Sequence, residues 1–107
     1  MEESEFKLKS GDVYNKIMNA FDDIDPDDAE PFFHLDNITI TFRNGVKFIV
    51  NRQTPARQIW LATKKKGLHF NYNAEKSQWL CSKTSSELFR TLSEAILEEL
   101  GEKVVFS

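Results

Sequence analysis

The side chains in this sequence that could do chemistry are most concentrated in a run of carboxylates between positions 22 and 30. Carboxylate oxygens are ligands for hard and borderline divalent ions such as Mg²⁺, Mn²⁺, Ca²⁺ and Fe²⁺. Like charges this close together repel one another, and a cation or a basic partner would relieve that repulsion. The alternative interpretation is a solvated, partly mobile linker. Six of the nine residues are acidic: Asp22, Asp23, Asp25, Asp27, Asp28 and Glu30.

No other residues have the spacing of a catalytic or cofactor motif. The sequence has no Gly-rich phosphate loop, no H-E-x-x-H, no Cys-x-x-Cys, no Glu-x-x-His and no nucleophile elbow. The single cysteine, Cys81, cannot form an internal disulfide or, alone, a zinc or iron–sulfur site. We therefore expect a protein that is not an enzyme and has no organic cofactor.

Length and composition predict one domain over residues 1–107, because 107 residues with 40% apolar content suffice for a single core. No apolar run approaches the ~18 residues needed to cross a bilayer. The acidic opening MEESEF lacks the basic and apolar regions of a signal peptide. We expect a cytoplasmic protein that does not bind membranes.

Charge is segregated along the chain. Residues 1–35 carry a net charge of −7, residues 36–84 carry +7, and residues 85–107 carry −3. Local potential governs which ions and partners approach a surface. We expect one surface that attracts cations and another that attracts anionic partners.

Apolar residues at helical spacing predict a first helix with Ser4 as its N-cap and Pro26 marking its end. Asp22 and Asp23 then oppose the helix dipole, which favours cations at this end. Such a local inconsistency is often functional. The apolar stripe consists of Phe6, Val13, Ile17, Ala20, Phe21 and Ile24.

Alternating residues predict a run of strands in the middle of the chain. Asn44-Gly45 predicts a type I′ hairpin turn between two of them. The expected strands are Phe32–Leu35, Ile38–Phe42, Val46 to Asn51 or Gln53, Gln58–Thr63, Leu68–Tyr72 and Gln78–Cys81.

A second helix is predicted after the strands. Thr84 and Glu87 fit a capping box, Gly101 suits the C-terminal end, and the tail at 104–106 should fold back onto the domain. The order helix, strands, helix indicates an α+β domain in which both helices cover one face of a largely antiparallel sheet. Its apolar stripe contains Leu88, Leu92, Ile96 and Leu100.

Alternation also assigns side chains to the open sheet face. Ile59 and Leu61 are the natural core pair of their strand, so Trp60 points the other way. An exposed Trp ringed by amides is typical of a binding hot spot. A Trp partly covered by long neighbouring side chains is the alternative, and alternation does not decide between them. The residues expected to meet there are Asn51, Gln53, Trp60 and His69.

One long stretch reads Asn51-Arg52-Gln53-Thr54-Pro55 and then Gln58-Ile59-Trp60-Leu61-Ala62. Around it lie Ile38-Thr39-Ile40-Thr41-Phe42 with Asn44-Gly45, then Gly67-Leu68-His69-Phe70 and the strand containing Trp79. With the final helix, the opening Ser4-Glu5-Phe6 and the run Asp22-Asp23-Ile24-Asp25, these stretches resemble the frataxin family over nearly the whole chain. The opening residues and the acidic run look like its bacterial members (CyaY).

The resemblance implies an α–β sandwich with two helices on one face of an antiparallel sheet. It implies an iron-binding regulator or iron chaperone of iron–sulfur cluster assembly that docks on a cysteine desulfurase and its scaffold protein. The implied metal is weakly bound Fe²⁺, with Fe³⁺ or other divalent ions as alternatives. By position the acidic ridge is Glu3, Asp12, Asp22, Asp23, Asp25, Asp27, Asp28 and Glu30, and the partner contacts are Asn51, Gln53, Trp60 and His69.

Some positions depart from the family pattern. Met18 and Asn19 stand where bacterial relatives often have acids, which thins the ridge and lowers the expected metal affinity. His69 lies near a position where mitochondrial members have an Arg. A ferroxidase or iron-storage protein is the alternative function. A nucleic-acid binder using Trp60 and Lys64–Lys66 is disfavoured by the net acidity. We expect a monomer, with iron-dependent oligomers as the alternative.

Overall fold

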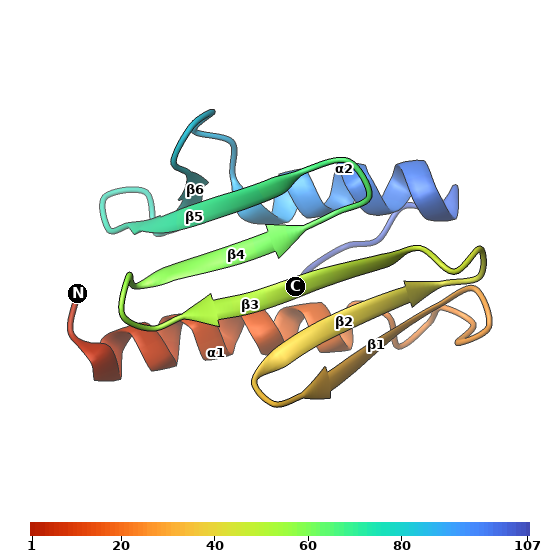
Figure 1. Ribbon diagram of the computed structural model, residues 1–107, viewed down its shortest axis with the longest axis horizontal. Helices are drawn as coiled ribbons and strands as arrows, with labels where there is room; N and C mark the ends of the chain where they lie inside the picture. The colour runs from red at the N-terminus through yellow and green to blue at the C-terminus, as the bar shows by residue number, and fades with distance from the viewer.

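Six strands joined by short turns form one sheet, and two helices cover one of its faces (Figure 1). The computed structural model describes residues 1–107. The predicted α+β architecture is confirmed. The elements are α1 (Glu3–Asn19), β1 (Ala29–His34), β2 (Asn37–Phe42), β3 (Lys47–Gln53), β4 (Gln58–Ala62), β5 (Gly67–Asn73), β6 (Gln78–Cys81) and α2 (Leu88–Leu100).

The sheet is an antiparallel meander in which each strand pairs with its neighbours in sequence. Asn51 of β3 lies opposite Trp60 of β4, which in turn lies opposite His69 of β5. Both helices run in the same direction behind the sheet in Figure 1. The turns after α1, β2 and β4 and the C-terminal end of α2 therefore lie at one end of the molecule.

The core lies between the sheet and the two helices, as one cluster of 20 buried residues. From α1 it contains Phe6, Val13 and Ile17 as predicted, and also Tyr14. Fully burying each large apolar side chain contributes about 1.5–3 kcal/mol relative to exposure, so the sheet is a firm platform for its outer face. No helix is long and apolar enough to cross a bilayer.

The first helix differs from the prediction at both ends. It begins at Glu3, and its N-cap is Glu2 without a side-chain hydrogen bond, so Ser4 is not the cap. It ends at Asn19, well before Pro26. Asp22 and Asp23 lie in the following turn, where the chain folds back towards the edge of the sheet. Ending the helix earlier keeps both carboxylates out of its last turn, where they would oppose the dipole.

The predicted capping box of the second helix is wrong. Glu87 is itself the N-cap, and its carboxylate accepts hydrogen bonds from the backbone N–H groups of Phe89 and Arg90. The preceding loop is tied to the edge of β6, because the N–H of Cys81 donates to the carbonyl of Ser86. The predicted ending at Gly101 is confirmed, with a left-handed φ of 75°. The tail also folds back as predicted, burying Val104.

Two hairpin turns also differ from the prediction. Asn44 does not have the positive φ of a type I′ turn, and only Gly45 is left-handed, at φ 88°. Since the N–H of Gly45 donates to the carbonyl of Phe42, the loop is a type I turn closed by a left-handed glycine. The β1–β2 turn is instead built on Leu35 (φ 49°) and Asp36 (φ 66°). β1 accordingly ends at His34 and begins earlier than predicted, at Ala29.

Candidate functional site

The α1–β1 loop carries the acidic run at one end of the molecule. Asp22, Asp23, Asp25 and Asp27 are all exposed. The six ion pairs of the structure include none of them. One oxygen of Asp25 accepts a hydrogen bond from the N–H of Asp27 at 2.9 Å, which shapes the loop. These four carboxylates are therefore free to meet a cation or a basic side chain from solvent.

Asp28 is held differently from its neighbours. The guanidinium of Arg43, in the β2–β3 turn, donates through both Nε and Nη2 to one Asp28 oxygen. The backbone N–H of Arg43 also donates to the carbonyl of Asp28, at 3.0 Å. The side-chain hydrogen bond with Asp28 and the charge of its carboxylate raise the pKa of Arg43. Asp28 is thus neutralised by the chain itself and anchors the acidic loop to the sheet.

The remaining ridge residues do not join the loop in one cluster. Glu3 pairs with Lys7 at 3.3 Å in the first turns of α1. Asp12 lies on the helix surface one turn from Lys9 and Lys16, and Glu30 is an exposed residue of β1. Nowhere do three or more His, Cys, Asp or Glu side chains converge on a position for a metal ion. The acidic ridge therefore consists of the unpaired carboxylates of the α1–β1 loop, with Glu3, Asp12 and Glu30 lying apart from them.

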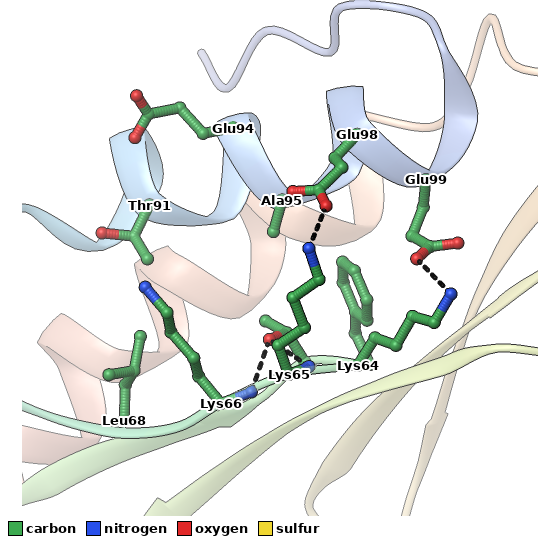
Figure 2. Close-up of a pocket in the computed structure, with 11 residues that line it drawn as sticks. Lys64, Lys65, Lys66, Leu68, Thr91, Glu94, Ala95, Glu98 and Glu99 are labelled. Atoms are coloured by element: carbon green, nitrogen blue, oxygen red, sulfur yellow. Dashed lines mark hydrogen bonds and ion pairs between the residues drawn. The ribbon is translucent and has the colours of Figure 1, made fainter.

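Two further acids at the same end come from α2, and the sequence analysis missed them. Lys65 Nζ lies 2.6 Å from Glu98 Oε1, and Lys64 Nζ lies 3.8 Å from Glu99 Oε1 (Figure 2). The hydrogen bond between Lys65 and Glu98 lowers the pKa of Glu98, and the same hydrogen bond raises the pKa of Lys65. A small cavity of about 170 Å³ lies between this turn and α2. Only the tertiary structure reveals these pairs, because 33 residues separate Lys65 from Glu98.

Part of the positive charge of segment 36–84 is taken up in ion pairs. Four of the nine Lys and Arg residues of segment 36–84 are paired with acids: Arg43, Arg52, Lys64 and Lys65. Arg52 lies on the helix side of β3, where its guanidinium carbon is 4.3 Å from the centroid of the Tyr14 ring. Of the bases in strands, Lys47 alone faces the open side. The other five bases of this segment have no ion pair, so its positive charge is only partly neutralised.

On the open sheet face, the predicted partner residues do come together. Register brings Asn51, Trp60 and His69 into one row across β3, β4 and β5. Gln53 donates from Nε2 to Asn51 Oδ1 at 2.7 Å. Trp60 Nε1 donates to Gln58 Oε1 at 2.9 Å. These hydrogen bonds hold the amide side chains and the Trp60 indole in place in the absence of a partner.

Trp60 is half-buried, because His69 stacks on one face of its ring with 4.0 Å between centroids. The alternative of a Trp partly covered by a neighbour is therefore closer to the structure than a freely exposed ring. Phe32 and Ile49 are 59% and 40% exposed on the same face, so apolar surface extends from Trp60 towards β1. Ile49 is two residues from Asn51 in β3, so strand alternation places both on the same face, but Phe32 could not be assigned without the β1–β2 register.

Three comparisons with known proteins bear on this arrangement. The family described as the frataxin-like domain matches residues 1–102. The chain is similar to the frataxin of Psychromonas ingrahamii, with 33% identity, a TM-score of 0.89, and coverage of 100% of this chain and 99% of that one. It shares the fold of a trimeric frataxin from the yeast Saccharomyces cerevisiae complexed with ferrous iron. That match has 21% identity, a TM-score of 0.64, and coverage of 95% and 88% of the two chains.

Proposed function

The chain belongs to the frataxin-like family, and from this membership we propose an iron-binding regulator or iron chaperone of iron–sulfur cluster assembly. Fe²⁺ is its cargo and is held weakly, with Fe³⁺ or divalent ions other than Fe²⁺ as alternatives. The acidic loop docks on a cysteine desulfurase, and the open sheet face contacts the scaffold protein. The protein works in the cytoplasm and is not itself an enzyme.

The observation that carries this proposal is the set of four exposed carboxylates without ion-pair partners: Asp22, Asp23, Asp25 and Asp27. Their oxygens are the donors that Fe²⁺ accepts alongside water. Because they are exposed and form no closed cage, iron keeps part of its hydration and exchanges readily. Asp12, Asp28, Glu3 and Glu30 belong to the same acidic ridge, with Asp28 and Glu3 already engaged by bases.

Partner docking follows from the same electrostatics. A basic groove on the desulfurase would gain attraction from every free carboxylate, and that attraction weakens as salt screens it. The contacts Asn51, Gln53, Trp60 and His69 supply a pre-ordered amide and aromatic surface for the scaffold. If iron and the desulfurase use the same acids, each must weaken the binding of the other by the same factor, because linkage is reciprocal.

The decisive experiment is charge reversal in the acidic loop. We expect Asp22→Lys with Asp23→Lys to weaken desulfurase binding at least tenfold in a titration at low salt, with a smaller difference at high salt. The matched control is Glu5→Lys with Glu75→Lys, which changes the net charge equally using two exposed acids elsewhere. Equal binding by both double variants and the wild type would contradict electrostatic docking through this loop.

A ferroxidase or iron-storage assembly is the second candidate, favoured by the trimeric state of the yeast frataxin of the same fold. Storage would require oligomers that grow as iron is added. Size-exclusion chromatography after anaerobic Fe²⁺ loading and exposure to air distinguishes the two candidates. We expect a monomer throughout and no acceleration of iron oxidation, and stable iron-dependent oligomers would favour storage.

A further inference from the structure

A shallow groove lies on the helix side of the molecule, between α1, β5, β6 and α2. Its floor is aromatic, formed by Tyr72, Trp79 and Phe89, and its volume is about 220 Å³. The groove lies on the opposite side of the sheet from Trp60, because Tyr72 and Trp79 point towards the helices. It shares only Asp12 with the acidic ridge and no residue with the partner face already described.

Two lysines line the groove without an acidic partner. Lys9 Nζ lies 5.4 Å from the centroid of the Tyr72 ring, and Lys16 Nζ lies 5.6 Å from that of Phe89. Neither takes part in any of the six ion pairs. Asp12, the one acid lining the groove, also has no ion pair, so the groove keeps a net positive charge. Its net positive charge favours an acidic ligand.

The chain's own C-terminal tail marks the adjoining surface as one that accepts an extended segment. The carbonyl of Val104 accepts a hydrogen bond from Ser93 Oγ at 3.3 Å. Further along, the ring of Phe106 packs on that of Phe89, with 5.1 Å between centroids. The tail therefore runs back along α2 on the helix side of the sheet (Figure 1). The groove begins at the same Phe89 ring, so an extended segment bound in it would adjoin the tail at that ring.

We propose that this groove binds an acidic, extended peptide segment of a partner protein, with an aromatic side chain on the floor and carboxylates at Lys9 and Lys16. The two lysines are seven residues apart on α1, which is about 10 Å along a helix. An extended peptide covers that distance in about three residues. The occupant is thus a short stretch in which acids flank one aromatic residue.

The test uses the full chain and a fluorescein-labelled peptide with two glutamates on each side of one phenylalanine. Fluorescence anisotropy should report binding that weakens about tenfold in the double variant Lys9→Gln with Lys16→Gln, since two exposed charge pairs are lost. The matched control, Lys47→Gln with Lys66→Gln, removes the same charge from lysines outside the groove and should bind within twofold of the wild type. Circular dichroism checks that all variants are folded.

Two comparisons would overturn the proposal. A peptide with glutamines in place of the glutamates should bind at least tenfold more weakly, and equal binding would exclude charge recognition. Equal losses in the two double variants would mean that overall charge, and not the groove, attracts the peptide. Absence of binding by the wild-type chain would also refute it. None of these measurements involves iron or the desulfurase, so they fail or succeed independently of the proposed function.

Discussion

The indole of Trp60 and the imidazole of His69 stack almost in parallel, with 4.0 Å between ring centroids and 5° between ring planes. The two residues face each other across β4 and β5, so the stack is set by strand register. Because Trp60 also donates to Gln58, its orientation on the open face is fixed from two sides. A pre-ordered aromatic surface loses little side-chain entropy when a partner binds.

The first prediction concerns that stack. Trp60→Ala should weaken scaffold binding by about 2 kcal/mol, roughly 30-fold, as expected for an aromatic hot spot. His69→Ala should have a smaller effect, because it uncovers the indole without removing it. Calorimetric titration with the scaffold protein measures both, with Leu80→Ala at the β6 edge as the control. Unchanged scaffold binding by Trp60→Ala would contradict a role for the open sheet face in binding this partner.

The second prediction concerns Arg43, which neutralises Asp28 next to the free carboxylates. Arg43→Gln should free one more acid and tighten Fe²⁺ binding about twofold to fivefold, the range expected when one exposed charge pair is removed. Anaerobic calorimetry checks this, and Arg57→Gln, in the β3–β4 turn, is the control with the same charge change. Weaker iron binding in Arg43→Gln would mean that the loop conformation matters more than its charge.

A third prediction follows from the β1–β2 turn. Leu35 has a φ of 49° and a side chain that is 80% exposed, so it is strained without a packing benefit. Since a left-handed conformation costs a typical L-residue about 1–2 kcal/mol, and Asn tolerates it better, Leu35→Asn should raise the free energy of unfolding by about 1 kcal/mol. Urea denaturation measures the change. Leu8→Asn removes a comparably exposed leucine from α1 and should not stabilise the protein.

The fourth prediction is a pH dependence at Tyr14. Burial raises the pKa of Tyr14 from 10.0 to about 12, although the nearby Arg52 guanidinium opposes that shift. The folded state therefore holds this proton more tightly than the unfolded state. Its contribution to stability is complete below pH 10 and is lost as the pH rises towards 12.

Tyr14→Phe isolates this effect. It removes the hydrogen bond from the Tyr14 hydroxyl to the carbonyl of Asp36, 2.8 Å long, and should cost about 1 kcal/mol near neutral pH. The deficit should shrink above pH 10. In a Tyr72→Phe background, ultraviolet titration of the remaining tyrosine should give a midpoint near 12. A midpoint near 10 would show that burial does not raise the pKa of Tyr14.

The spacing of apolar residues along the chain was enough to predict the sheet layer and the helix layer of this protein. Strands such as β3 and β4 alternate between core and open face, so Phe48 and Val50 are buried while Asn51 and Trp60 are not fully so. The stripe Leu88, Leu92 and Ile96 likewise placed α2 on the sheet. These patterns are local, because burying one face of an element requires only the residue spacing of that element.

Where charges are neutralised was decided by the tertiary structure alone. Asp28 and Arg43 are 15 residues apart, and Lys65 and Glu98 are 33 apart. Which acids stay free depends on which turns meet at one end of the sheet, and no periodicity in the chain encodes that meeting. The N-terminal ends of both helices were also beyond the sequence, because Glu2 and Glu87 became caps through the path of the flanking chain. The chain by itself thus determined an acidic, two-layer domain, and folding selected which of its carboxylates stay exposed and unpaired.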